Sequence, residues 1–207
     1  MIEQQEISVS GKAISNEALD QLFFEARTQN AWKSDPVSED LLRQVYDLVR
    51  MAPTSANGSP ARFVIVISTE AKERLKSHIA PTNVDKIMAA PVSVIIAHDL
   101  DFGDKMPQLF PAAGDAMKAY FATDEQMANE TAFRNGSLQG AYFIIAARAL
   151  GLDCGPISGF NNAGVDAEFF PKGRIKSNFI CAIGHGDPSG VWPRNPRLSF
   201  EEACQIL

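Results

Sequence analysis

Three short segments of this 207-residue sequence combine residue types that could hold an anionic ligand with a ring. The first reads Ala-Arg-Thr-Gln-Asn over residues 26–30, where Arg27 ends an amphipathic helix pattern and three hydrogen-bonding side chains follow. A guanidinium bonds phosphate oxygens in pairs, so this segment could grip a phosphate and a polyol. The alternative is a solvated helix end, because arginine is common on protein surfaces.

The second and third segments are a stiff turn and a glycine-rich turn. Residues 53–60 read Pro-Thr-Ser-Ala-Asn-Gly-Ser-Pro, so two prolines restrict a loop that offers short donors and acceptors to a flat ring. Residues 155–160 read Gly-Pro-Ile-Ser-Gly-Phe, and their glycines permit close backbone approach to a ligand. Free N–H groups there could bond an anionic ring edge. For both segments, an ordinary turn is the alternative.

Other candidate motifs are weaker. Residues 184–190 resemble a dinucleotide-binding fingerprint, but the third glycine falls one place late and no helix pattern follows, which argues against a Rossmann fold. The three cysteines have neither redox-motif nor zinc spacing and are expected to be reduced thiols. The three histidines are far apart, so we expect no metal site.

Composition and charge indicate a soluble globular protein. The chain is 45% apolar and 21% charged, and its length fits one domain. A net charge of −6 without clustered lysine and arginine argues against a nucleic-acid partner. The polar N-terminus lacks a signal peptide and the apolar runs are too short to span a bilayer. We therefore expect a cytoplasmic protein with no membrane partner.

The hydrophobic pattern predicts an α+β domain in layers. Helical periodicity occurs over residues 14–26, 39–52, 69–79, 83–89 and 125–150, and a capping box at Ser199 opens a short last helix. Ser38 and Asp124 are the expected N-caps of the second and the longest helix, and Gly151 is the expected stop of the longest. Continuous apolar runs predict buried strands over residues 62–67, 92–97 and 177–184. We expect a central mixed sheet flanked by helices. The second half of the 125–150 helix is apolar nearly all round, which predicts burial on all sides, centrally or at a subunit interface.

Residues 101–122 are harder to interpret. Aromatic side chains occur there among glycine, proline and aspartate, which suggests an ordered excursion that covers a pocket.

Taken together, the three segments resemble the FMN-dependent nitroreductases from Phe23 to the C-terminus, and a late Pro196-Arg197 adds a fourth match. The resemblance implies a nitroreductase-like fold, with residues 1–13 as a mobile arm and 14–207 as a single FMN-binding domain. It also implies an intertwined homodimer with the flavin at the subunit interface. The implied flavin-binding residues are Arg27, Thr28, Gln29, Asn30, Pro53, Thr54, Ser55, Asn57, Pro156, Ile157, Ser158, Gly159 and Arg197.

The longest matching stretches, residues 27–32, 53–62, 131–135 and 197–203, resemble the malonic semialdehyde reductase branch of that family. This resemblance implies ping-pong hydride transfer from NADH or NADPH, through FMN, to malonic semialdehyde, giving 3-hydroxypropanoate. Arg62 or Arg134 would pair with the acceptor's carboxylate, although each could equally form a structural ion pair. The resemblance assigns no catalytic side chain.

Two alternatives to this function remain. The first is a broad-specificity nitro- or quinone reductase, and the second is a non-catalytic flavin-binding protein. Three departures from the common nitroreductase pattern bear on the choice. Ala31 stands where many members have lysine, residues 59–61 replace Gln-Pro-Trp, and Ser158 replaces glutamate. These changes alter local charge and leave the preference between NADH and NADPH open.

Overall fold

The computed structural model describes residues 11–207, so most of the predicted N-terminal arm at residues 1–13 lies outside the described residues. One sheet has the order β1-β2-β4-β3. Its strands are β1 (Ala61–Val66), β2 (Val92–Asp99), β3 (Asp153–Ile157) and β4 (Ile175–Gly184). All three strand pairs are antiparallel. The sequence predicts a mixed sheet, with parallel and antiparallel strand pairs. Among residues 11–207, the parallel pairing is limited to one isolated bridge, between Thr28 and Cys154.

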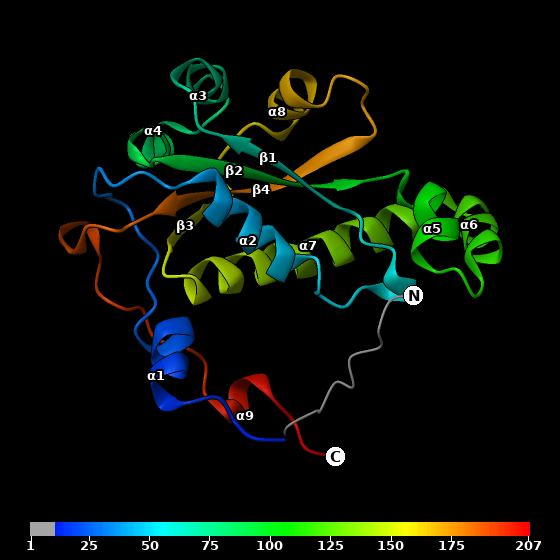
Figure 1. Cartoon of the computed structure of the whole chain (residues 1–207), viewed down its shortest axis with the longest axis horizontal. Helices are drawn as coiled ribbons and strands as arrows, with labels where there is room; N and C mark the ends of the chain where they lie inside the picture. The colour runs from blue at the N-terminus through cyan, green and yellow to red at the C-terminus, as the bar shows by residue number, and fades with distance from the viewer. Residues whose placement is uncertain (1–10) are drawn as a thin grey trace.

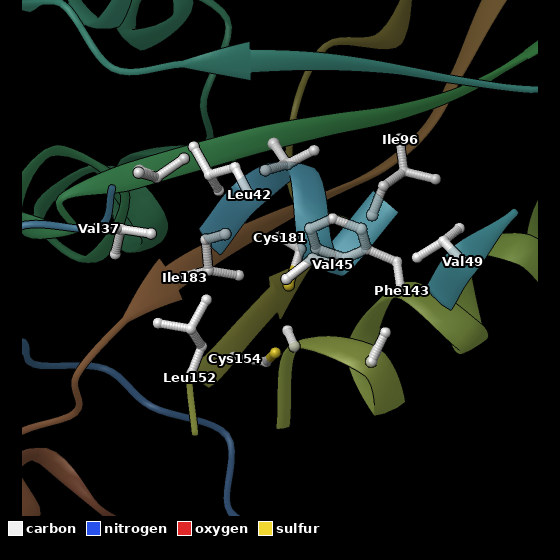
Figure 2. Packing of buried hydrophobic residues seen from close by; sticks show 14 residues of the cluster. Val37, Leu42, Val45, Val49, Ile96, Phe143, Leu152, Cys154, Cys181 and Ile183 are labelled. Atoms are coloured by element: carbon white, nitrogen blue, oxygen red, sulfur yellow. The ribbon is translucent and has the colours of Figure 1, made fainter. Parts of the chain in front are cut away.

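Helices cover both faces of the sheet (Figure 1). On one face lie α3 (Thr69–Lys76), α4 (Val84–Ala89) and α8 (Asn162–Phe169), and on the other lie α2 (Glu39–Val49) and α7 (Glu125–Ala149). Figure 2 shows the core between the sheet, α2 and α7, where Val45, Val49 and Phe143 pack together. All of β2 except its last residue is buried, as its continuous apolar run predicts. The α+β fold class is confirmed.

Local signals set the helix ends. Ser38 Oγ accepts from Leu41 N at 3.2 Å, and the Asp124 carboxylate accepts from Met127 N at 3.0 Å. Such caps satisfy N–H groups that a helix start leaves unpaired. Gly151, at φ +80°, ends α7 in a conformation that favours glycine. The Ser199 capping box is present at the start of α9 (Phe200–Ala203). All of these caps agree with the sequence-based predictions.

The long helix α7 is only partly buried within one chain. It buries Phe143, Ala146 and Ala147 against the core but leaves Phe133, Leu138 and Tyr142 between 40% and 53% exposed. The single chain therefore does not bury the helix on all sides, and the predicted alternative, burial at a subunit interface, stays a prediction. Apolar composition could not distinguish a helix surrounded by its own fold from one with an open apolar face, because both have the same sequence pattern.

The excursion between β2 and α7 is ordered. It contains the 3-10 turn η4 (Phe102–Lys105), α5 (Met106–Leu109) and α6 (Gly114–Ala122). These pack around their own small core of Phe102, Met106 and Phe121, closed by alanines of α7. The excursion and the first turns of α7 line an open cavity of about 270 Å³, and the covering of a pocket by the excursion stays a prediction.

The N-terminal helix is shorter than predicted. The α-helix α1 spans Asn16–Leu19 and continues as a π-helical turn, η1 (Asp20–Phe24), instead of reaching residue 26. The remaining short elements are the 3-10 turns η2 (Ser55–Asn57), η3 (Pro81–Asn83) and η5 (Pro188–Gly190). The sequence pattern missed α8 and interpreted β3 as a turn. Within residues 11–207, no helix has the length and apolarity that crossing a membrane would require.

Candidate active site

A cavity of about 710 Å³ opens at the end of the sheet where β3 finishes. Its walls come from the N-terminal segment, α4, the end of α7 and the segment after η5. The cavity brings together several residues predicted from the sequence: Arg27, Thr28, Asn30, Pro156, Ile157, Ser158 and Arg197. Segments far apart in the sequence therefore meet at one site.

Backbone hydrogen bonds hold the N-terminal segment against β3. Gln29 N donates to Cys154 O at 3.0 Å, next to the Thr28–Cys154 bridge. On its other side, Asp187 N donates to Ala31 O at 3.0 Å. Gly155 permits the close approach, because a Cβ there would lie 2.6 Å from both Gln29 O and Lys86 Cε.

The cavity concentrates positive charge. One carboxylate lines it, that of Asp85. The cations that line it are Arg27, Lys86, Arg148, Arg194 and Arg197. Within the described part of the chain, none of these five forms an ion pair with a carboxylate. Because the whole chain carries −6, this local excess of unpaired cations indicates a site for an anionic ligand.

Lys86 is the most unusual of these cations. It is only 9% exposed, and its Nζ lies 3.4 Å from Pro156 O. Burial lowers the pKa of the Lys86 ammonium below its ordinary value. A negative ligand group beside Lys86 would compensate for this desolvation. Lys86 was not predicted from the sequence, because the short helix α4 has too few turns for its hydrophobic pattern to show which side is buried.

Backbone carbonyls orient the arginines. The Arg27 guanidinium donates to Trp192 O, and Arg194 donates to Phe24 O at 2.5 Å and to Ala26 O at 3.2 Å. These acceptors are neutral, so the arginines keep their full charge toward the cavity. Arg148 and Arg194 were not predicted from the sequence as site residues, although both line the cavity.

Two predicted residues lie just outside the cavity lining. Gln29 is 7% exposed and packs against Gly186, and its buried Oε1 has no hydrogen-bond partner among residues 11–207. Gly159 lies behind the wall, where its carbonyl accepts from Ala80 N at 3.0 Å and from Asn83 Nδ2 at 3.3 Å. Gln29 and Gly159 therefore support the wall instead of facing the cavity.

The predicted flavin-binding loop at residues 53–60 lies away from the cavity of its own chain. Pro53, Thr54, Ser55 and Asn57 do not line the cavity. Ser55 N donates to Asn135 Oδ1 of α7 at 2.9 Å, and Asn57 Nδ2 donates to Leu109 O at 2.8 Å. Thr54 Oγ1 accepts from the N–H of Ser59 at 3.1 Å, which closes the loop on itself.

The same loop is strained. Three of its non-glycine residues have positive φ, at 49° for Ala56, 57° for Asn57 and 41° for Ser59. Each costs about 1–2 kcal/mol relative to an ordinary conformation, and such strain clusters at functional sites. A loop held this rigidly keeps its polar groups in a fixed arrangement.

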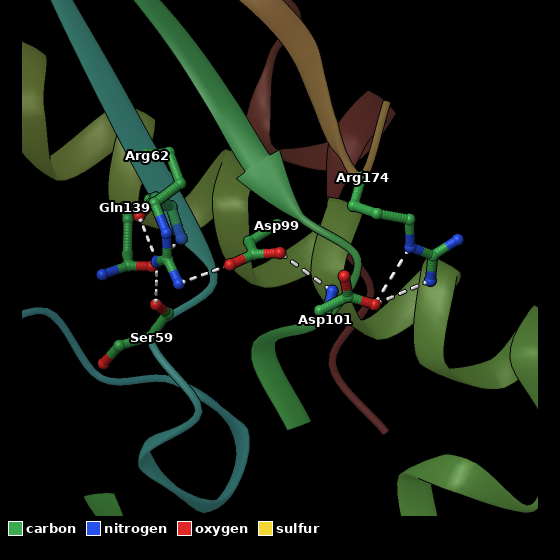
Figure 3. A network of polar contacts seen from close by, with 7 residues as sticks. Ser59, Arg62, Asp99, Asp101, Gln139 and Arg174 are labelled. Carbon is green, nitrogen blue, oxygen red and sulfur yellow. Dashed lines mark hydrogen bonds and ion pairs between the residues drawn. The ribbon is translucent and has the colours of Figure 1, made fainter. Parts of the chain in front are cut away.

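The two predicted substrate arginines differ. Arg62 pairs with Asp99 at 2.7 Å and donates to Ser59 O at 3.1 Å, so it takes the structural alternative (Figure 3). Arg134 is exposed on α7, and none of the hydrogen bonds or ion pairs described for residues 11–207 involves it. Arg134 directly precedes Asn135, which anchors the strained loop.

The buried thiol of Cys181 is a poor candidate for nucleophilic chemistry. All three cysteines are free, as predicted; Cys154 and Cys181 are buried, whereas Cys204 is exposed. A hydrogen bond with Cys154 is the largest cause, and burial the second, that raises the pKa of the Cys181 thiol well above its usual range. A thiol that stays protonated is a poor nucleophile, which argues against Cys181 as a reactive group.

Known proteins resemble the chain in sequence and in fold. A protein of Rhodopseudomonas palustris named as an NADH dehydrogenase/NAD(P)H nitroreductase is 58% identical over 189 residues, covering 91% of this chain and 95% of that protein. The similarly named HadB of Ralstonia pickettii is 56% identical over 187 residues, covering 89% and 95% of the two chains.

A solved nitroreductase of Exiguobacterium sibiricum in complex with FMN matches the fold with a TM-score of 0.84 at 18% identity, covering 94% of this chain and 99% of that one. The nitroreductase YdfN of Bacillus subtilis matches with a TM-score of 0.83 at 21% identity, covering 92% and 99%. The model of the nitroreductase family matches residues 25–185, which include the N-terminal wall of the cavity, α4 and β3. The chain therefore belongs to the nitroreductase family.

Proposed function

We propose that the chain is an FMN-dependent oxidoreductase that accepts hydride from NADH or NADPH. The observation that carries this proposal is the group of unpaired cations around the 710 Å³ cavity. FMN has a phosphate at one end and a ring edge that becomes negative on reduction. The cavity offers several arginines and the buried Lys86, so the donor set fits the cofactor.

Arg27 and Arg197 would hold the phosphate, and Lys86 with the backbone of residues 156–158 would face the ring. When bound, FMN supplies the hydride chemistry, for which the chain has no side chain of its own. Lys86 and the N–H groups provide preorganised positive charge, which stabilises negative charge that develops on the ring. Donor and acceptor would occupy the same face in turn, in a ping-pong order.

We further propose a homodimer in which each cavity is completed by the partner's strained loop. Within one chain, the loop at residues 53–60 does not line the cavity. The family resemblance nevertheless assigns both the loop and the cavity residues to the flavin. The exposed apolar residues of α7 offer a surface for a second copy. Arg27→Ala and Asn57→Ala chains can be mixed to test this. In a random mixture, about half of the dimers are mixed, and one of the two sites in each carries both wild-type residues. Flavin binding should therefore return at about a quarter of all sites, and no recovery would contradict shared sites.

The proposed acceptor is a small carbonyl acid such as malonic semialdehyde. Arg134 supports this proposal, because it is exposed without an ion pair and is adjacent to the residue that anchors the strained loop. A guanidinium in that position can pair with a carboxylate. Arg134→Gln should raise the KM for the semialdehyde about tenfold and leave the KM for a neutral quinone unchanged. An equal effect on both would argue against carboxylate recognition.

The cytoplasm is the proposed location, which the three free thiols support. A decisive first test is a visible spectrum of the protein reconstituted with FMN, followed by anaerobic addition of NADH and then NADPH. Bleaching of the flavin is expected, and the faster donor identifies the preference. A panel of acceptors then separates a semialdehyde reductase from a broad nitro- or quinone reductase. Bound flavin that neither nucleotide reduces would overturn the enzymatic proposal.

A further inference from the structure

The end of α7 and the π-helical turn η1 form a reciprocal clasp beside the cavity. Gln21 Nε2 donates to Arg148 O at 2.6 Å, and Arg148 donates through one terminal nitrogen to Leu22 O at 3.0 Å. The π-helix is rare and occurs frequently at functional sites. This clasp fixes the turn that leads directly into Arg27, so it links the longest helix of the fold to the anion-binding end of the cavity.

Arg148 itself lines the cavity together with Arg27. It is half-buried, and in the part of the chain that the structure describes it has no carboxylate partner. Its position in the last turn of α7 places its positive charge at the negative end of the helix dipole, which favours the charged side chain there. A guanidinium has five N–H groups, so the bond to Leu22 O leaves donors for a ligand.

Arg148 and Arg194 both line the cavity, but the fold holds Arg148 more firmly. Arg194 lies on the exposed segment after η5, and its partners among the described residues are the backbone carbonyls of residues 24 and 26. Arg148 belongs to a 25-residue helix that packs on the sheet. A cation on such an element is held in place before any ligand arrives, which makes it better suited to selective recognition.

We propose that Arg148 is a specificity-determining residue that selects phosphorylated flavin over riboflavin. Together with Arg27, which lines the same cavity, it would offer two guanidiniums to the phosphate dianion, whereas a ligand without phosphate would leave both of them without a charged partner. This inference rests on the FMN site proposed above and adds a residue that the family resemblance did not supply.

The test is the affinity of the full chain for FMN and for riboflavin, measured by quenching of flavin fluorescence. Arg148→Gln removes the charge and, because glutamine is shorter, also gives up the bond to Leu22 O. We expect its Kd for FMN to rise about tenfold to thirtyfold and its Kd for riboflavin to stay within about twofold. Equal losses for both ligands, or an unchanged Kd for FMN, would overturn the proposal.

Two further variants separate recognition from folding. Gln21→Ala breaks the clasp from the other side and keeps the Arg148 charge, so its loss of FMN affinity should stay well below that of Arg148→Gln. An equal loss in the two variants would assign the effect to the clasp and not to the Arg148 charge. Arg148→Lys keeps the charge but loses the paired geometry, so a loss of about threefold confined to FMN is expected. Should Arg148→Gln not fold, Arg148→Lys decides alone, and an equal loss for both ligands would contradict the inference.

The outcomes also distinguish this inference from the proposed function. A wild-type chain that binds neither flavin would remove the FMN site itself. A wild-type chain that binds FMN tightly, together with an Arg148→Gln chain that binds it equally well, would remove only the role of Arg148.

Discussion

Arginines at the two ends of the molecule are held in opposite ways. At the end near the excursion, Arg62 pairs with Asp99 at 2.7 Å and Arg174 pairs with Asp101 at 2.9 Å (Figure 3). At the cavity end, Arg27 and Arg148 bond, among residues 11–207, only to backbone carbonyls. A guanidinium whose charge the fold neutralises contributes to structure, whereas one whose charge the fold leaves uncompensated can serve a ligand. Residue type alone does not distinguish these roles.

The largest expected effect on binding comes from the cavity end. Arg27→Gln should raise the Kd for FMN about thirtyfold to a hundredfold, because a charge-assisted bond to phosphate is lost. Its free energy of unfolding without ligand should change by less than about 0.5 kcal/mol, since no carboxylate depends on Arg27. Fluorescence titration and urea unfolding measure the two quantities. A large loss of stability in the ligand-free chain would place Arg27 among the structural arginines.

The paired end should respond in the opposite way. Asp99→Asn removes the partner of a partly buried guanidinium and should lower the free energy of unfolding by about 1–3 kcal/mol. The Kd for riboflavin should stay within about twofold, because Asp99 is not among the cavity residues. Asp104→Asn, which removes the partner of an exposed lysine, is the matched control and should cost little. Equal costs in the two variants would contradict the distinction.

The strained loop offers a third test. Asn135→Ala removes its bonds to the N–H of Ser55, at 2.9 Å, and to Ser55 Oγ, at 3.3 Å. The free energy of unfolding should fall by about 1–2 kcal/mol, because a buried partner is lost and the positive-φ residues lose their anchor. If the loop completes the partner's cavity, the Kd for FMN should rise as well. Unchanged FMN affinity in a destabilised Asn135→Ala chain would mean that the loop is structural only.

The smallest expected effect concerns His98, which lies near the paired end. Burial lowers the pKa of His98, against the opposing influence of Asp166 and Asp99 and with a small contribution from Lys176. The unfolded chain then binds the proton first as the pH falls through about 6.5. The buried neutral His98 therefore contributes to stability above that pH, and this contribution is lost below it. His98→Gln should show a smaller fall in stability between pH 7.5 and pH 5 in urea unfolding, and an unchanged fall would exclude His98 as a cause.

Local sequence signals predicted much of the fold. The caps at Ser38 and Asp124 start their helices as expected, since they depend only on neighbouring backbone N–H groups. The continuous apolar runs identified β1, β2 and β4, because strands buried on both faces need no polar alternation. The pattern failed at β3, where Gly155 and Pro156 are typical of a turn. Pairing with β4 overrides that preference, so β3 is a property of the sheet and not of its own residues.

The residues of the candidate site also fall into two groups, those predicted from local sequence and those identified only by packing. Residue types and spacing were enough to identify Arg27, residues 156–158 and Arg197, and the cavity brings them together. Lys86 and Arg148 carried no local signal, because each lies in a helix whose sequence does not indicate a ligand. Only packing shows that Lys86 is buried beside Pro156 and that Arg148 reaches the wall beside Arg27.

The sequence by itself therefore determined the elements that depend on neighbours: helix caps, buried strands and the motifs that mark the family. Tertiary structure alone decided which charges are neutralised. Arg62 and Arg27 have the same side chain, and each lies beside a proline- or polar-rich segment. Arg62 meets Asp99 because β1 pairs with β2, whereas Arg27, within residues 11–207, bonds to the neutral carbonyl of Trp192. Ion pairing acts over a few ångströms in space, so contacts between distant segments decide it and local sequence does not.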